Sequence, residues 1–149
     1  MCLLGCDIGS SSVKASIVDK DTGLTLASDF YPKEEAAIKA VRPGWAEQNP
    51  EEWWSAVCRA TKETVQKAGI DPAEIAGVGI DGQSWSAIAL DKEGKVLTNT
   101  PIWMDTRAQE ICERLNKKIG EDKIFEVAGN SLQPSYTTAK IIWYKENLP

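Results

Sequence analysis

The sequence of 149 residues contains no histidine, and its four cysteines include no C-x-x-C pair. Zinc sites of the usual kinds and His-based catalytic triads are therefore not expected. Without an imidazole, any proton transfer would fall to a carboxylate, a lysine, a tyrosine or water. Cys2 and Cys6 lie on one face of the first predicted strand, which favours a role as small buried hydrophobic residues.

Long apolar runs and an excess of basic residues are also missing. No stretch approaches the roughly 20 apolar residues of a membrane span, and the N-terminal MCLLGCDIG lacks the pattern of a signal peptide. The formal net charge is −5, with 17 Lys and Arg against 22 Asp and Glu. This balance argues against nucleic acid or a membrane as the main partner. We therefore expect a cytoplasmic protein.

The distribution of apolar residues predicts one α/β domain with a mixed sheet and flanking helices. Strands are predicted at 3–8, 13–19 and 24–30, joined by short polar turns into an antiparallel meander. Asn49, Pro50 and Gly69 mark the start and end of an amphipathic helix, in which Trp53 and Trp54 are interpreted as core residues. The other predicted elements are strands at 75–80, 84–90 and 101–104 and helices at 105–120, 121–128 and 138–147.

Residues 6–16, CDIGSSSVKAS, include the turn between the first two predicted strands. They carry a carboxylate, a glycine and three adjacent hydroxyl groups, which is more than a hairpin requires. Gly9 lets the backbone approach an anion closely, and successive N–H groups of a tight turn can bind a phosphate. Asp7 could face a phosphate only with Mg²⁺ or its waters in between. The alternative is a plain hairpin whose side chains bond their own backbone. Hydroxyl donors and a positive charge are supplied by Ser10, Ser11, Ser12 and Lys14.

Four stretches, in the same order, resemble the FGGY carbohydrate kinases. GCDIGSSSVKASIVD resembles the first phosphate-binding hairpin of the actin, hexokinase and heat-shock-chaperone superfamily, to which these kinases belong. RPGWAEQNPEEWW resembles their proline-glycine-tryptophan loop, GVGIDGQSWSAIALD their sugar-pocket strands and PIWMDTRA their tryptophan-aspartate-arginine motif. GNSLQPSYTTAKIIWYKENLP is similar to the family's next segment, especially in xylulokinases.

The resemblance implies a ribonuclease-H-like (actin-like ATPase) fold and an ATP-dependent kinase of xylulose or a related ketose, with Mg²⁺ as cofactor. The resemblance does not decide the oligomeric state, and a homodimer is one possibility. Asp7 would be the catalytic residue that organises Mg²⁺ through water, and Lys14 with residues 9–12 would hold phosphate. Sugar contacts are implied for Gln83, Ser84, Trp85, Trp103, Asp105 and Arg107.

Other interpretations of these residues stay open at this point. The two indoles could pack in the core, and Asp105 could be a helix cap with Arg107 as its ion partner. Xylulokinases usually carry Met-His where this chain has Ser84-Trp85, and Asp81 stands where a small hydroxyl residue is more usual. Both differences leave the identity of the sugar open.

FGGY kinases are several times longer than 149 residues. We therefore expect residues 1–149 to be the N-terminal part of their first domain, with the proton-abstracting aspartate and the adenosine-binding lobe outside this stretch. Two other functions are considered. One is a non-catalytic sugar-binding module, and the other is a metal-dependent ribonuclease-H-like nuclease that would use Asp7, Asp81 and Asp105. The acidic net charge argues against the nuclease.

Overall fold

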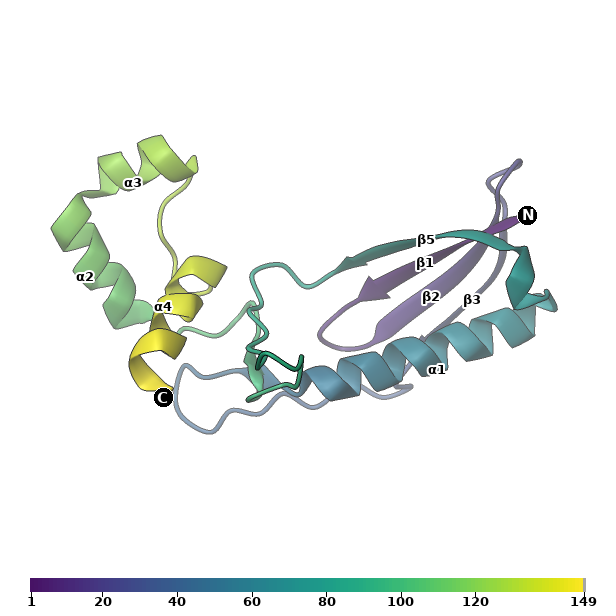
Figure 1. Cartoon of the computed structure of the whole chain (residues 1–149), viewed down its shortest axis with the longest axis horizontal. Helices are drawn as coiled ribbons and strands as arrows, with labels where there is room; N and C mark the ends of the chain where they lie inside the picture. The colour runs from purple at the N-terminus through teal and green to yellow at the C-terminus, as the bar shows by residue number, and fades with distance from the viewer. Residues whose placement is uncertain (149) are drawn as a thin grey trace. The chain divides into compact units, whose positions relative to one another are not determined.

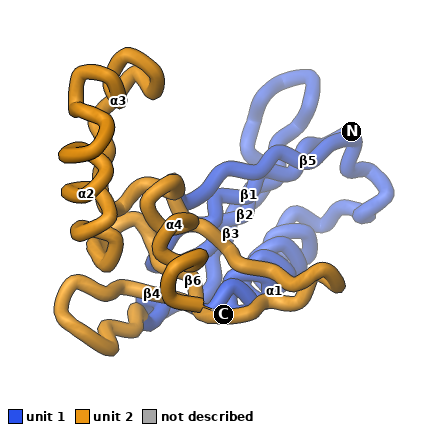
Figure 2. The backbone as a smooth tube through the Cα atoms, turned by 60° about the vertical axis from the view of Figure 1, so that its left-hand side comes forward, with its two compact units in different colours: residues 1–37, 49–83 blue, residues 38–48, 84–149 orange. Residues whose placement is uncertain are grey.

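The computed structural model describes residues 1–148, which form two compact units (Figure 2). Unit 1 combines residues 1–37 with 49–83, and unit 2 combines residues 38–48 with the chain from residue 84 onward. Each unit is therefore built from two separate stretches of the sequence. No helix among residues 1–148 has the length and apolar content needed to cross a membrane.

Unit 1 contains a four-stranded mixed sheet in the order β3-β2-β1-β5 (Figure 1). The strands β1, β2 and β3 pair antiparallel, and β5 pairs parallel to β1. The predicted antiparallel meander and the mixed sheet are thus confirmed. The strands are β1 (Cys2–Ile8), β2 (Val13–Asp19), β3 (Thr25–Tyr31) and β5 (Ile75–Gly82).

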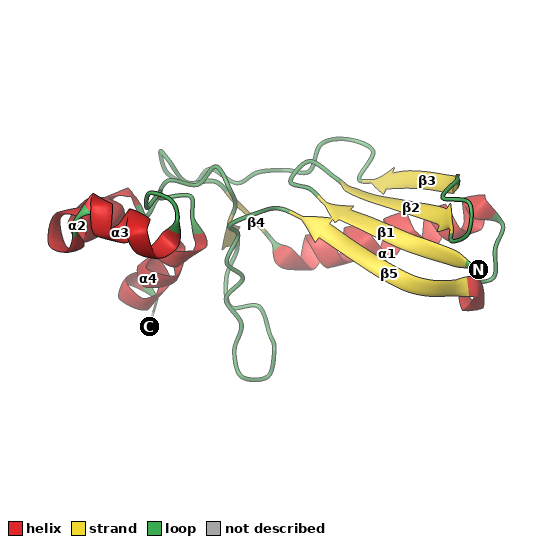
Figure 3. Cartoon of the chain, turned by 90° about the horizontal axis from the view of Figure 1, so that it is seen from above, coloured by secondary structure: helices red, strands yellow, loops and turns green. Residues whose placement is uncertain are grey.

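Helix α1 (Pro50–Ala68) covers one face of this sheet (Figure 3). The Asn49 side chain accepts a hydrogen bond from the Glu51 N–H, and Gly69 ends the helix at a φ of 67°, as its sequence signals predict. The core that joins helix and sheet consists of Cys2, Leu4, Cys6, Val13, Ala15, Ile17, Ala56 and Ala60.

The helix approaches the sheet through small residues, so Trp54 is not part of this core. Ala56 and Ala60 are buried, whereas the Trp54 side chain is 65% exposed. The predicted core role of Trp54 is wrong. A short 3₁₀ turn at Pro72–Glu74 then leads the chain from α1 into β5.

Unit 2 is largely helical. Its two-residue strands β4 (Glu47–Gln48) and β6 (Thr100–Pro101) pair antiparallel. Its helices are α2 (Gln109–Ile119), α3 (Glu121–Ala128) and α4 (Thr137–Asn147). Its core contains Ala108, Ile111, Cys112 and Ala139, with Leu115, Leu132, Ile142 and Trp143 packed against them.

Three predicted elements of unit 2 differ from the structure. The strand at 84–90 does not form, and only Leu90 makes an isolated bridge, with Val96. The strand at 101–104 is reduced to β6, and the helix predicted from residue 105 begins at Gln109. At Trp85 the backbone has a φ of 63°, which lies outside the range of a strand.

Candidate functional site

The hairpin between β1 and β2 turns tightly at Gly9. The Gly9 N–H donates to the carbonyl oxygen of Ser12 at 3.1 Å. A Cβ atom at residue 9 would lie 2.9 Å from that same oxygen, so the turn requires glycine. The Ser11 carbonyl accepts a hydrogen bond from the Ala36 N–H at 2.8 Å, which fixes the outer side of the turn.

The sheet face opposite α1 carries two rows of residues next to this hairpin. Strand register places Gly5 beside Gly79, and Asp7 beside Asp81, on the parallel strands β1 and β5. On the other side of β1, Lys14 of β2 lies opposite Asp7, and its Nζ contacts the Asp7 carboxylate at 3.3 Å. Because residues two apart share a face, the glycine pair and the aspartate pair lie side by side.

These two rows line an open hollow of about 490 Å³. A Cβ atom at Gly5 or Gly79 would meet no other atom within 4 Å, so the glycines leave space there. The side chain of Asp7 is 50% exposed. Two accessible carboxylates, with room for waters and phosphate oxygens, are the donor set that Mg²⁺ prefers. The residues present therefore fit a magnesium-bound nucleotide, although binding by this hairpin stays a prediction.

At the end of β5, the chain stays close to β1. The Asp81 carboxylate accepts a hydrogen bond from the Gly82 N–H at 2.7 Å. A Cβ atom at Gly82 would lie 3.0 Å from the Ile8 carbonyl oxygen, and that oxygen also accepts from the Gln83 N–H at 3.0 Å. Gln83 therefore belongs to unit 1, whereas the other five predicted sugar residues belong to unit 2.

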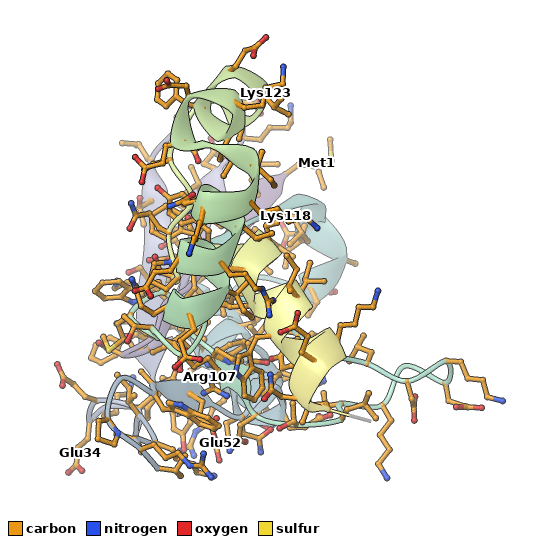
Figure 4. The ribbon with its side chains drawn as sticks, turned by 90° about the vertical axis from the view of Figure 1, so that its left-hand side faces the viewer. Met1, Glu34, Glu52, Arg107, Lys118 and Lys123 are labelled. Carbon is orange, nitrogen blue, oxygen red and sulfur yellow. The ribbon has the colours of Figure 1, made fainter. Side chains whose placement is uncertain are left out.

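In unit 2, Asp105 and Arg107 form a buried ion pair. The guanidinium donates to both carboxylate oxygens at 2.8–3.0 Å and to Glu47 at 2.8 Å. The Ala46 N–H donates to Asp105 at 2.7 Å, and Arg107 Cζ lies 3.8 Å from the Trp45 ring centroid. The position of Arg107 just before α2 is labelled in Figure 4.

Burial changes the electrostatics of this pair. The side chains of Asp105 and Arg107 are 0% and 3% exposed. Burial by itself would lower the pKa of Arg107, but hydrogen bonds to Asp105 and Glu47 outweigh it and raise that pKa. Asp105 is not a helix cap, because α2 begins at Gln109 and its N-cap is Ala108. Sugar contact by this pair stays a prediction, and its contacts show that it fixes the turn before α2.

The two candidate sugar-facing indoles are partly exposed. Trp85 and Trp103 are 46% and 45% exposed, so neither is a core residue. The Trp85 ring packs against the Tyr136 ring, with 4.8 Å between centroids. Ser84, next to Trp85, is also exposed. These side chains offer the apolar faces and the hydroxyl group that sugars bind.

The two-metal nuclease finds no support in this geometry. Among residues 1–148, no group of three or more His, Cys, Asp or Glu side chains is arranged to hold a metal ion. Asp7 and Asp81 are neighbours in unit 1, but both Asp105 oxygens are engaged by Arg107 within unit 2. A metal site that uses all three aspartates is therefore absent from the described residues.

Comparison with known proteins decides the family. The description "FGGY family of carbohydrate kinases, N-terminal domain" matches residues 2–149. The chain belongs to the FGGY family of carbohydrate kinases. Glycerol kinase of Thermococcus kodakarensis is 32% identical over 148 residues, which are 99% of this chain and 29% of that protein. Xylulose kinase of Bacillus subtilis is 30% identical, over 99% of this chain and 28% of that protein.

Solved structures of FGGY kinases share the fold. Xylulose kinase from Rhodospirillum rubrum matches with a TM-score of 0.89 and 24% identity, over 100% of this chain and 30% of that one. Ligand-bound xylulose kinase from Lactobacillus acidophilus matches with a TM-score of 0.85 and 25% identity, over 98% of this chain and 28% of that one. The predicted actin-like ATPase fold is confirmed. The chain spans less than a third of the length of these FGGY relatives.

Two residues that matter in unit 2 escaped the sequence analysis. Glu47 shares Arg107 with Asp105, and Lys140 is fully buried beside the segment that carries Trp85. The signal for Lys140 was available, because a lysine within the apolar run Ala139–Trp143 of a predicted helix requires a partner. Glu47 lies in a loop-like stretch, where no periodic pattern marks a buried charge.

Proposed function

We propose that this chain is the N-terminal portion of an ATP-dependent sugar kinase that phosphorylates a hydroxyl group of xylulose or a related ketose. The observation that carries the proposal is the glycine pair beside the aspartate pair at the β1–β5 edge, in a chain of the FGGY family. Glycines that leave space and carboxylates that remain accessible are the features that a magnesium-bound phosphate needs.

In this proposal unit 1 holds the phosphates. Asp7 orients the waters of Mg²⁺, and the N–H groups and hydroxyls of residues 9–12 bind phosphate oxygens. Lys14, which contacts Asp7, adds a positive charge. The metal supplies neutralisation of the charge that develops on the transferred phosphoryl group. Catalysis by these residues is therefore a matter of positioning and charge.

Sugar binding is assigned to the predicted residues of unit 2. Trp85 and Trp103 offer apolar faces to the C–H surfaces of a sugar, and Ser84 offers a hydroxyl. During transfer the sugar oxygen forms a bond to the γ-phosphorus, the bond to ADP breaks, and the sugar proton passes to a base. In this proposal that base lies outside residues 1–149, which correspond to 29% of the glycerol kinase of Thermococcus kodakarensis.

The test is an acceptor panel on the intact protein that contains this chain. ADP release is measured with xylulose, other ketoses, gluconate and glycerol, in the presence of MgATP. We expect sugar-dependent ADP release, strongest with a ketose. If activity is strongest with glycerol, the proposed ketose substrate is wrong but the proposed kinase activity stands. Sugar binding by calorimetry without ADP release from any acceptor would instead establish a non-catalytic sugar-binding module.

A further inference from the structure

Lys140 of α4 is a buried cation that donates hydrogen bonds to two backbone carbonyl groups. Its residue exposure is 0%, and its Nζ donates to the carbonyl oxygens of Ile102 at 2.8 Å and Trp85 at 3.1 Å. A lysine is rarely buried completely, because its charge loses the solvation of water. In this position one ammonium group joins two segments that are 17 residues apart and that carry the exposed indoles Trp85 and Trp103.

The same face of α4 makes further contacts with the first of these segments. Tyr144, one helical turn after Lys140, donates its hydroxyl to the Ala87 carbonyl oxygen at 2.9 Å. Tyr136, one turn before Lys140, packs its ring against Trp85. Side chains four residues apart share a face of a helix. Two side chains of α4, those of Lys140 and Tyr144, and the N-cap residue Tyr136 therefore fix residues 85–87, which we call the Trp85 segment.

These contacts explain how the Trp85 segment keeps its unusual backbone. Trp85 has a φ of 63°, and for a bulky residue this left-handed region is unfavourable unless the surroundings impose it. The carbonyl groups of Trp85 and Ala87, which a strand would use for its ladder, accept from Lys140 and Tyr144 instead. The conformation that presents the Trp85 side chain thus depends on α4.

We propose that Lys140 is a positioning residue of the sugar site. It acts through the carbonyls of Trp85 and Ile102, and it holds the Trp85 and Trp103 segments in the arrangement that receives the sugar. The side chain is fully buried and directs its donors to the backbone, so it does not itself contact the sugar. This proposal rests on the proposed function, because it assigns a support to the sugar residues named there.

The first experiment compares Lys140→Met with Lys145→Met in the intact protein. The second variant makes the same change at an exposed lysine of the same helix. We expect Lys140→Met to raise the KM for the sugar about tenfold or more, as the loss of hydrogen bonds from a charged donor suggests. The KM for ATP should change less than about threefold, and Lys145→Met should resemble the wild type.

A double-mutant cycle then separates positioning from a general loss of stability. If Lys140 acts through Trp85, Lys140→Met should weaken sugar binding far less in a Trp85→Ala background than in the wild type. Independent, additive losses in the two variants would overturn the proposal. If Lys140→Met does not fold, Tyr144→Phe replaces it in the cycle. That change removes only the hydroxyl that donates to Ala87, and a smaller increase of the sugar KM is expected.

A readout without catalysis distinguishes this proposal from the proposed function. Backbone amide exchange over residues 84–90 should quicken in Lys140→Met and not in Lys145→Met. Unchanged exchange would overturn the positioning role even in an active kinase, and faster exchange with unchanged sugar affinity would overturn its link to the sugar. A wild-type protein that phosphorylates no acceptor would overturn the proposed kinase activity. A wild-type protein that also binds no sugar in calorimetric titration would overturn the sugar role of Lys140.

Discussion

At Asp7 a single carboxylate lies between a lysine and a second aspartate. Lys14 and Asp81 are its neighbours on β2 and β5, and its side chain is half exposed. In the proposed kinase Asp7 acts on the metal and phosphates and does not contact the sugar. Its contribution should therefore appear in the transition state and not in sugar affinity.

We accordingly expect Asp7→Asn in the intact protein to lower kcat by about a hundredfold or more, the range seen when one preorganised electrostatic group is lost. The Kd for the sugar should stay unchanged in calorimetric titration. Asp21→Asn, an exposed carboxylate in the turn after β2, is the matched control and should keep full activity. An unchanged kcat in Asp7→Asn would leave the hairpin with a purely structural role.

Asp105 illustrates how burial changes the effect of removing a charge. Replacing Asp105 with alanine leaves the Arg107 guanidinium without one of its two acid partners and the Ala46 N–H without its acceptor. We expect Asp105→Ala to lower the free energy of unfolding by about 3–5 kcal/mol, as is typical when one member of a buried pair is lost. Chemical denaturation measures this loss.

The control for that measurement is Asp122→Ala, an exposed acid in the first turn of α3, which should change stability by less than about 1 kcal/mol. Calorimetric sugar titration of the folded Asp105→Ala protein tests the predicted sugar contact separately. A strong loss of stability with unchanged sugar affinity would show that Asp105 supports the fold alone.

At the scale of elements, the sequence was most informative where local signals decide the structure. The β1–β2 hairpin and helix α1 follow from alternation, from the Asn49 cap and from Gly69, all of which act within a few residues. The segment at 84–90 has the same alternation, yet it forms no strand, because distant residues of α4 take its carbonyl groups. Tertiary contacts of this kind leave no trace in the local pattern.

Two further errors concern the start of one helix and the buried face of another. The helix predicted from residue 105 begins at Gln109, because Asp105 is engaged with Arg107 and Ala46 and does not cap the helix. Trp54 is exposed because Ala56 and Ala60 of α1 face the sheet. The residues of the candidate site also differ in how clearly the sequence marks them. The motif residues near β1 could be named from the sequence, and Lys140 carries a signal because it lies within an apolar run of a predicted helix. No periodic pattern marks Glu47 as a buried support.

The glycines of the first hairpin and strand allow a matched test of the phosphate site. Gly9→Ala brings a Cβ atom within 2.9 Å of the Ser12 carbonyl oxygen, so we expect it to lower stability by about 1–3 kcal/mol. Gly5→Ala meets nothing within 4 Å and should leave stability unchanged or slightly higher. Its methyl group enters the hollow beside Asp7, so it should weaken nucleotide binding.

Thermal melting and calorimetric titration with MgATP, both on the intact protein, measure the two effects. If Gly5→Ala binds nucleotide as tightly as the wild type, the hollow between β1 and β5 is not where the phosphates bind.

At the scale of the whole molecule, the buried Lys140 should leave a pH signature in stability. Burial lowers the pKa of Lys140 to about 8 from the ordinary 10.5. Between these values the unfolded chain binds more protons than the folded one, so stability should rise with pH across this window, by up to about 3 kcal/mol. Burial raises the pKa of Cys112, which works in the opposite direction above pH 9.

The difference between wild type and Lys140→Met cancels the contribution of Cys112. In urea denaturation at pH 7, 8, 9 and 10, the free energy of unfolding of the wild type should rise with pH relative to that of Lys140→Met. Lys145→Met should follow the wild type. Parallel curves for wild type and Lys140→Met would mean that Lys140 titrates at an ordinary pKa.

Each unit of the chain has a hydrophobic core of its own, but the chain spans less than a third of the length of its FGGY relatives. In our proposal the base that accepts the sugar proton and the lobe that binds adenosine lie outside residues 1–149. We therefore expect the purified 149-residue chain to show no sugar-dependent ATP consumption above background. A coupled assay of ADP release measures this, with circular dichroism as evidence that the chain is folded. Activity that survives repeated purification and disappears in Asp7→Asn would contradict the prediction, since the base would then have to lie among the residues described here.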